Sequence, residues 1–218
     1  MCIISFYKQG DQVVLTHNRD EQISRLASLA IEERKWNNKT FYAPIDQSKN
    51  GTWIFYSEQY IACILNGGKE KPIHLKPSYE KSRGIVLLDL LKYDSVADFV
   101  KKETLIGIAP FTIFVFERFS KKTFLLFWNE NELEVKDLSS LNFVFRASST
   151  LYSLDKMLEL ENIFHKFSKT SPEIVFDIHN SIKMKDGDVE IGKATTSITQ
   201  IVAESTDITM KYCPFLSL

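Results

Sequence analysis

Short runs in which apolar and polar residues alternate recur along the whole chain, with the period of half-buried β-strands. The first two runs are 2–7 and 12–17, and the polar residues 8–11 that join them include a glycine. Two runs joined in this way predict a β-hairpin. Further runs, many of them rich in aromatic residues, predict strands at 31–36, 40–43, 52–56, 60–65, 111–117, 123–128, 133–138, 143–147, 194–203 and 206–212.

Helical patterns interrupt these runs in two places. Residues 84–93 are apolar nearly all round, and residues 94–103 begin with an Asp-Ser pair that is typical of a helix start. The segment 171–183 begins with a serine and a proline, an N-cap followed by proline at the first helical position. The clearest helix is predicted at 152–169, where one face carries Met157, Leu160, Phe164 and Phe167. The alternation of strands and helices favours an α+β fold with a sheet-on-sheet core and outer helices.

Composition is that of an ordinary globular protein. The chain has 218 residues, of which 44% are hydrophobic and 25% charged, and its formal net charge is −1. At this length we expect a single domain spanning residues 1–218. The balanced charge gives no overall field that would attract nucleic acid, and no apolar stretch approaches the roughly twenty residues of a membrane span. Without a signal-peptide pattern, and with three widely spaced cysteines, the sequence predicts a cytoplasmic protein.

Metal and nucleotide sites lack support in the sequence. The four histidines form no HxxxH pair and the three cysteines form no CxxC pair, so the spacing of a zinc site is absent. Neither GxGxxG nor GxxxxGK occurs. We therefore expect no cofactor. Two of the histidines, His165 and His179, are expected to lie solvated on the polar faces of their helices.

The residues that do predict chemistry lie at the N-terminus. Cys2 follows Met1 directly, and aminopeptidases remove an initiator methionine readily when the second residue is small. The product carries an α-amine and a thiol on one residue, with ordinary pKa values of roughly 7.7–8.0 and 8.5. Such an amine can take the proton of its own thiol and so create a nucleophile. If Tyr7 pairs with Gln12, Cys2 lies opposite His17. The face that they share would then consist of Cys2, Ile4, Phe6, Val13, Leu15 and His17.

The tetrad Asn18-Arg19-Asp20-Glu21, after a strand that begins with Met-Cys, resembles the signature of the NRDE family, which includes the transport and Golgi organisation proteins. Other segments are similar to the family in the same order, although Leu26 and Asn50 replace a usual proline and glycine. These segments are Gly51-Thr52-Trp53, Leu65-Asn66-Gly67, Ser82-Arg83-Gly84, 148–152 and 196–199. The resemblance implies an N-terminal-nucleophile hydrolase-like fold, a four-layer αββα sandwich of two antiparallel sheets.

The resemblance also implies site residues for hydrolysis of a small amide or acyl conjugate. Cys2 would be the nucleophile, Asp20 would hold its amine through a charge-assisted hydrogen bond, and Asn66 would supply the oxyanion hole. Arg19 would either orient the substrate or form a salt bridge with a neighbouring carboxylate. The further substrate-binding candidates are Asn18, Trp53 and Ser148. His17 stands where the cholylglycine and penicillin amidases have an arginine, so the resemblance does not carry their substrate chemistry over to this sequence.

Other hypotheses stay open at this point. Cys2 also fits an ordinary buried strand position. The many aromatic residues also suit a carrier for a hydrophobic small molecule such as haem or an acyl conjugate, and an inactive hydrolase fold would serve protein contacts. The lysine-rich segment 68–82 is either a solvated loop or a lid that attracts an anionic group. A small-molecule substrate or ligand is the expected partner, and the pattern predicts no oligomeric state.

Overall fold

The structure is a computed structural model, and it describes residues 2–70, 75–165, 171–188 and 191–215. None of the helices in these ranges is both long and apolar enough to span a membrane.

The chain divides into two compact units. One consists of Met1–Arg25 together with Ser140–Leu218, and the other consists of Leu26–Ser139. Each unit contains one antiparallel sheet and its own helices. The predicted α+β class with two antiparallel sheets is therefore confirmed, and the two units supply the sheets and helices that an αββα sandwich requires.

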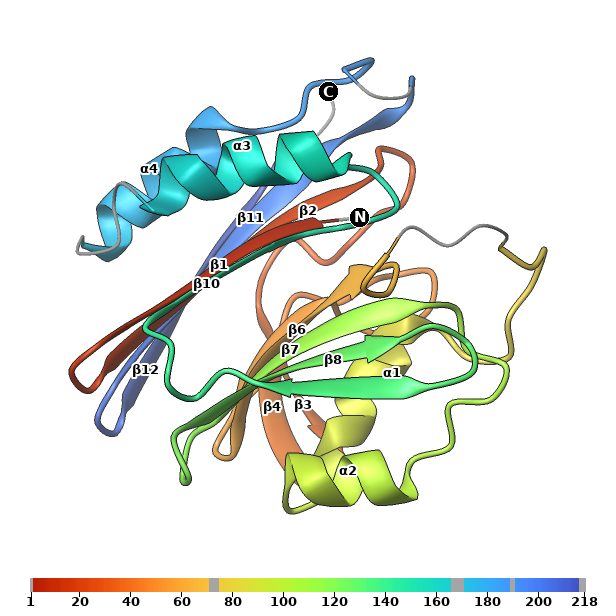
Figure 1. The fold of residues 1–218 in the computed structure, drawn as a ribbon, viewed down its shortest axis with the longest axis vertical. Helices are drawn as coiled ribbons and strands as arrows, with labels where there is room; N and C mark the ends of the chain where they lie inside the picture. The colour runs from red at the N-terminus through yellow and green to blue at the C-terminus, as the bar shows by residue number, and fades with distance from the viewer. Residues whose placement is uncertain (1, 71–74, 166–170, 189–190, 216–218) are drawn as a thin grey trace. The chain divides into compact units, whose positions relative to one another are not determined.

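The first unit is built on five strands, which are β1 (Cys2–Gln9), β2 (Gln12–Gln22), β10 (Phe143–Ala147), β11 (Lys193–Glu204) and β12 (Asp207–Pro214). Their order in the sheet is β10-β1-β2-β11-β12, and all neighbours are antiparallel (Figure 1). Strands β1 and β2 are buried on both faces over most of their length. The N-terminal hairpin thus forms the centre of this sheet.

Two helices, α3 (Leu154–His165) and α4 (Pro172–Ser181), lie across one face of this sheet (Figure 1). Proline begins α4, as its sequence predicts. Of the apolar face predicted for α3, Leu160 and Phe164 are buried and Met157 packs beside them, while Phe167 lies outside the described residues. The core between sheet and helices consists of Ile3, Tyr7, Ala147, Leu160, Phe164, Val175 and Ile178.

The N-terminal hairpin has a different register from the predicted one. Its strands are joined by two residues rather than four, so Cys2 lies opposite Arg19 instead of His17. Gly10 takes the first turn position with a φ of 60°, which glycine adopts without steric cost and which such short turns require. The shift amounts to two residues, and an even shift keeps every side chain on its face. The predicted shared face is therefore correct, while the predicted pairing of Cys2 with His17 is wrong.

The second unit contains a seven-stranded sheet whose strands lie side by side in chain order. They are β3 (Glu32–Trp36), β4 (Lys39–Ala43), β5 (Ile54–Ser57), β6 (Tyr60–Asn66), β7 (Phe111–Glu117), β8 (Lys122–Trp128) and β9 (Leu133–Asp137). The segment between β6 and β7 contains α1 (Arg83–Asp89), the 3-10 helix η1 (Leu90–Lys92) and α2 (Val96–Lys102). These bounds agree with the predicted ones to within a few residues.

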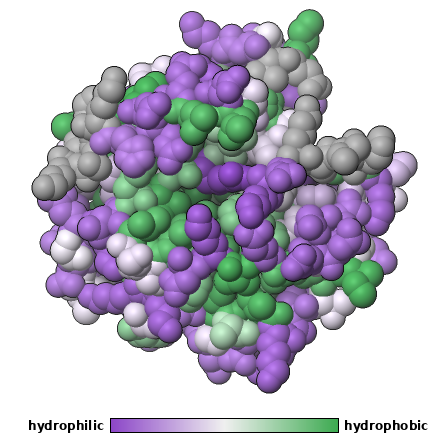
Figure 2. Space-filling view, viewed as in Figure 1, coloured by the Kyte–Doolittle hydropathy of each residue, from purple (hydrophilic) through white to green (hydrophobic). Residues whose placement is uncertain are grey.

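The surface carries residues of both kinds. On the face shown in Figure 2, hydrophilic side chains are numerous and hydrophobic ones gather in patches among them. Leu154 and Leu158 on α3 are examples of large hydrophobic side chains that are mostly exposed. Exposed apolar side chains are normal in globular proteins, because polar residues alone do not cover the surface, so we assign no partner to this one.

Two glycines bring the start of α1 against the loop before β5. Ser82 caps the helix, and its side chain accepts a hydrogen bond from the N–H of Ile85. A Cβ added to Gly84 would lie 2.7 Å from the carbonyl oxygen of Thr52, and one added to Gly51 would lie 2.7 Å from the backbone of Gly84. Two of the segments that resemble the NRDE signature therefore form one backbone-to-backbone contact.

Replacing Gly84 by Ala is expected to lower the free energy of unfolding by about 1–3 kcal/mol, because the added methyl group overlaps backbone atoms that cannot rotate away. In a helix without this contact the same change would stabilise by up to about 1 kcal/mol. Urea unfolding followed by tryptophan fluorescence measures the effect, since all three tryptophans lie in the second unit. A variant as stable as the wild type would show that the two segments separate without cost.

Candidate functional site

Cys2 begins the central strand β1 and is 4% exposed. The backbone N–H of Ser148 donates a hydrogen bond of 2.8 Å to its carbonyl oxygen. Burial raises the pKa of the Cys2 thiol, and the negative charge of Asp20 raises it further. The buried thiol is therefore a poor nucleophile unless a base takes its proton.

Asp20 follows the residue that pairs with Cys2, and its side chain is fully buried. The hydroxyl of Tyr152 donates to Oδ2 at 2.8 Å, and the hydroxyl of Thr195 donates to Oδ1 at 2.6 Å. Burial raises the pKa of Asp20 to about 6, although both hydrogen bonds act to lower it. Near neutral pH this carboxylate is thus a buried negative charge that is close to its titration range.

The two hydroxyl groups reach Asp20 from distant parts of the sequence. Tyr152 lies in the turn between β10 and α3, where its N–H bonds to the carbonyl of Ser148 at 3.1 Å. Thr195 lies opposite Asp20 on β11 and is tied to Met184 by two hydrogen bonds of 2.9 and 2.8 Å. Neither hydroxyl was predicted from the sequence. The only signal was that Tyr152 ends one of the NRDE-like segments and that Thr195 directly precedes another.

The tetrad Asn18-Arg19-Asp20-Glu21 lies inside β2 rather than after it. Its side chains therefore alternate between the two faces of the sheet. Arg19 and Glu21 share the face of Cys2, whereas Asn18 and Asp20 share the face that α3 and α4 cover. The thiol and the Asp20 carboxylate thus lie on opposite faces of the sheet, with the backbone at the start of β1 between them.

Arg19 is held within the first unit by its neighbours. One of its guanidinium nitrogens donates to the carbonyl of Arg25 at 3.1 Å and to the hydroxyl of Thr196 at 3.0 Å. Glu21 forms an ion pair of 3.1 Å with Arg25. These contacts give Arg19 a fixed position beside Cys2, and its substrate-orienting role stays a prediction.

Asn18 forms the centre of a buried polar contact with α4. Its amide nitrogen donates to the backbone carbonyl of His179 at 3.0 Å, and its amide oxygen lies 2.7 Å from Nδ1 of the same histidine. Nε2 of His179 lies 2.8 Å from the hydroxyl of Ser5. His179 is fully buried, which lowers its pKa to about 3, so the prediction of a solvated His179 is wrong. Asn18 and His179 join β2 to α4, and a substrate contact by Asn18 stays a prediction.

The other predicted site residues are distributed over both units. Ser148 is buried, and its hydroxyl lies 2.8 Å from that of Thr150. In the second unit, Asn66 ends β6 opposite Phe111, and Trp53 is buried just before β5. Their roles in binding or catalysis stay predictions.

The described lysines of the segment 68–82 form ion pairs with carboxylates of their own unit. Lys71 and His74 lie outside the described residues. The ion pairs of the other three lysines are Lys69–Glu134 at 2.9 Å, Lys76–Glu130 at 2.8 Å and Lys81–Asp89 at 2.6 Å. A lysine beside a carboxylate attracts an anion less strongly. The described part of this segment therefore favours the surface-loop interpretation over a lid.

A family comparison agrees with the residues around Cys2. The sequence profile of Transport and Golgi organisation 2 matches residues 1–209. The chain belongs to this family. The predicted resemblance to this family is thereby confirmed. No curated protein matches the sequence.

Two solved structures resemble this member of the Transport and Golgi organisation 2 family. One is a conjugated bile acid hydrolase from Clostridium perfringens, solved as its C2A mutant. It has a TM-score of 0.64 and 10% identity, and the match covers 98% of this chain and 92% of the hydrolase. The other is penicillin V acylase from Agrobacterium tumefaciens, with a TM-score of 0.57, 9% identity and coverage of 100% and 87%. At these identities the matches show the fold alone, so this family member has the fold of these two enzymes, in agreement with the predicted N-terminal-nucleophile hydrolase-like fold.

Proposed function

We propose that this protein is an N-terminal-cysteine hydrolase that cleaves a small amide or acyl conjugate with Cys2, after Met1 has been removed. The observation that carries the proposal is the buried Asp20 carboxylate, which two hydroxyl groups hold beside the start of β1. A buried charge is costly to maintain, and such groups gather at functional sites.

The strand register supports a contact between Asp20 and the new N-terminus. Since Cys2 pairs with Arg19, the next residue on β2 lies beside the nitrogen at which β1 begins. Removal of Met1 turns this nitrogen from an amide into an amine. Asp20 then accepts a hydrogen bond from the amine, which fixes the amine next to its own thiol. This bond becomes charge-assisted once the amine has taken the proton of the thiol.

The proposed reaction follows from this pairing. The neutral amine takes the proton of Sγ, and the thiolate attacks the substrate carbonyl carbon. The ammonium group then gives the proton to the leaving nitrogen, the C–N bond breaks, and an acyl thioester remains on Cys2. The same amine takes a proton from water as the water attacks the thioester, and it returns the proton to the departing sulfur. Asn66 is the proposed donor to the oxyanion.

The similar structures support Cys2 as the reacting residue of this chain. One of them is a hydrolase with the same fold, solved with the cysteine at its own second position replaced by alanine. The other is an acylase, which also acts on an acyl group. Identities of 9–10% do not carry their substrates over to this chain. The test is therefore a panel of simple amides, acyl amino acids and thioesters, with product release measured by mass spectrometry. A purified protein that lacks Met1 and cleaves none of them would contradict the proposal.

Protein made with normal aminopeptidase activity is expected to lack Met1, because the second residue is small and the mechanism needs its amine. Intact-mass measurement decides this directly. A matched pair of proteins tests the consequence: an uncleaved tag at the N-terminus should abolish turnover, while the same tag at the C-terminus should leave it unchanged. Complete retention of Met1 would remove the proposed base.

A further inference from the structure

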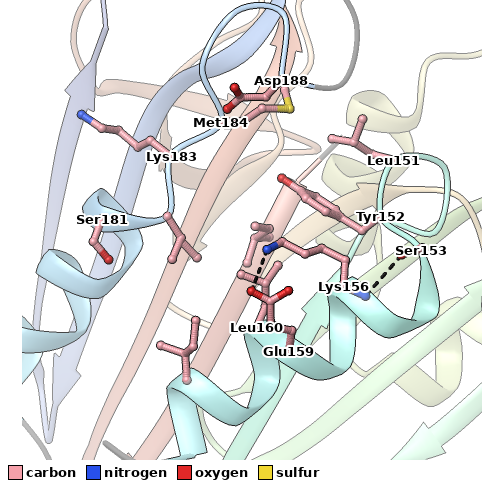
Figure 3. A pocket seen from close by; sticks show the side chains of 13 residues that line it. Leu151, Tyr152, Ser153, Lys156, Glu159, Leu160, Ser181, Lys183, Met184 and Asp188 are labelled. Atoms are coloured by element: carbon pink, nitrogen blue, oxygen red, sulfur yellow. Dashed lines mark hydrogen bonds and ion pairs between the residues drawn. The ribbon is translucent and has the colours of Figure 1, made fainter.

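A cavity of about 720 Å³ lies within the first unit, between α3 and the segment that follows α4. Its floor includes the buried side chains of Ile3, Leu160 and Met184. Tyr152 and Lys156 also line it, and Figure 3 shows the side chains around this space. The volume falls within the roughly 300–1,000 Å³ of small-molecule sites. Polar and charged side chains, including Lys156, Glu159 and Asp188, line the rest of the cavity.

This cavity lies on the helix-covered face of the sheet. Ile3 contributes to its floor and projects to the face opposite Cys2, because neighbouring residues of a strand point to opposite faces. The cavity is therefore separate from the thiol. The proposed hydrolysis does not place its substrate there.

The polar groups at the cavity indicate the kind of molecule that it would hold. Lys156 forms an ion pair with Glu159 at 2.8 Å, which occupies one of the three donor hydrogens of its ammonium group. The remaining hydrogens can bind an acceptor oxygen, while Glu159 and Asp188, which also line the cavity, weaken the attraction of Lys156 for an anion. The ammonium of Lys183, another lining residue, lies 4.2 Å from the ring centre of Phe215 and is directed toward that ring. Lys156 is thus the group that would bind the head of a ligand whose apolar body covers Ile3 and Leu160.

Two residues that line the cavity are each linked to Asp20. The ring of Tyr152 forms part of one wall, and its hydroxyl donates to Asp20 at 2.8 Å. Met184 contributes to the floor, and its backbone N–H donates at 2.8 Å to the Thr195 hydroxyl that bonds to Asp20 at 2.6 Å. A ligand that shifts Tyr152 or the backbone of Met184 would therefore change the hydrogen bonds that hold this carboxylate.

We propose that this cavity is a second binding site, for a small molecule with an aromatic or aliphatic body and a carboxylate head, and that its occupancy changes the hydrogen bonds to Asp20. Only the consequence for turnover rests on the proposed hydrolysis. Binding itself does not need Cys2. Protein that binds the ligand but cleaves no substrate would overturn the hydrolase proposal and leave this site standing.

The binding test uses 4-phenylbutyrate as the probe and its amine counterpart, 4-phenylbutylamine, as the matched control. For a ligand of this size we expect a Kd of about 0.1–3 mM, measured by titration calorimetry or ligand-observed NMR. Lys156→Met should weaken binding at least about fivefold, since it removes the head-group contact. Lys8→Met makes the same charge change on β1, away from the cavity, and should leave Kd unchanged. Equal binding of the amine would overturn the ligand class.

Ile163→Trp should abolish binding by filling the cavity, and thermal unfolding shows whether this variant is folded. Ser181→Trp enters from the exposed end of α4 and gives a second blocking variant that avoids the core. Binding that survives in both folded variants would overturn the site.

The link to Asp20 is measured by the ¹³C signal of its carboxyl carbon, assigned with Asp20→Asn. Saturating probe should move this signal in the wild type, and an unmoved signal with probe bound would overturn the link.

Discussion

Replacing Cys2 by Ala is expected to lower kcat by on the order of 10⁴-fold or more on any substrate that the wild type cleaves, because the nucleophile is lost. Alanine still allows removal of Met1 and keeps an amine at the same position, so the effect isolates the thiol. The fold should persist, since only one sulfur is removed from the start of β1. Turnover of the best substrate in the panel, together with thermal unfolding, measures both properties.

Two matched variants separate this loss from a general effect of losing a cysteine. Cys63 is buried in β6 and Cys213 is partly exposed in β12, so Cys63→Ala and Cys213→Ala remove a thiol elsewhere and should retain turnover. A carrier gives a different result: its hydrophobic ligand co-purifies, and the affinity survives Cys2→Ala. No turnover by wild type together with ligand binding that survives Cys2→Ala would favour the carrier hypothesis.

Local patterns were sufficient for the elements of the fold but insufficient for the register of the first hairpin. The runs 2–7 and 12–17 predicted both strands, and their period of two placed Cys2 on the correct face. The length of the turn decides which residue of β2 lies opposite Cys2. Strand β2 continues to Gln22, and the polar tetrad within it is mostly buried. Alternating polarity does not reveal a strand that is buried on both faces.

The site residues show the same division between local and distant information. His179 lies four residues after Val175, on the buried side of α4, so helical spacing contained the signal for its burial. The partners of Asp20 were different, because Tyr152 and Thr195 are 132 and 175 residues away from it in the sequence. Only the fold brings these hydroxyls together, and no pattern within a window of sequence predicts such a contact.

Replacing Asp20 by Asn is expected to stabilise the protein at high pH and to impair catalysis at the same time. The folded-state pKa of about 6 lies above the ordinary value of 3.8, so the folded protein holds this proton more tightly than the unfolded chain. The resulting stability is complete below about pH 4 and is lost as the pH rises through 6. Asn stays neutral and avoids this loss. Its stability relative to wild type should therefore increase by about 2–3 kcal/mol between pH 4 and pH 8.

The companion variant Tyr152→Phe should act in the opposite direction. It removes a hydrogen bond that lowers the pKa of Asp20, so the pH-dependent loss of stability should become larger and its midpoint should move to higher pH. Urea unfolding of wild type and both variants, at several pH values from 4 to 8, measures these differences. Parallel pH profiles for wild type and Asp20→Asn would show that the buried carboxylate costs no stability.

The catalytic half of the prediction is a decrease in kcat of about ten- to hundredfold for Asp20→Asn, the loss expected when a charge-assisted hydrogen bond to the amine becomes a neutral one. The same protein samples serve both measurements, at a pH where Asp20 is ionised in the wild type. A more stable but slower variant means that the wild type keeps this buried charge at a cost in stability, for the sake of the amine. If Asp20→Asn instead lowers stability at every pH and leaves kcat unchanged, Asp20 serves only to hold Tyr152 and Thr195 against the sheet.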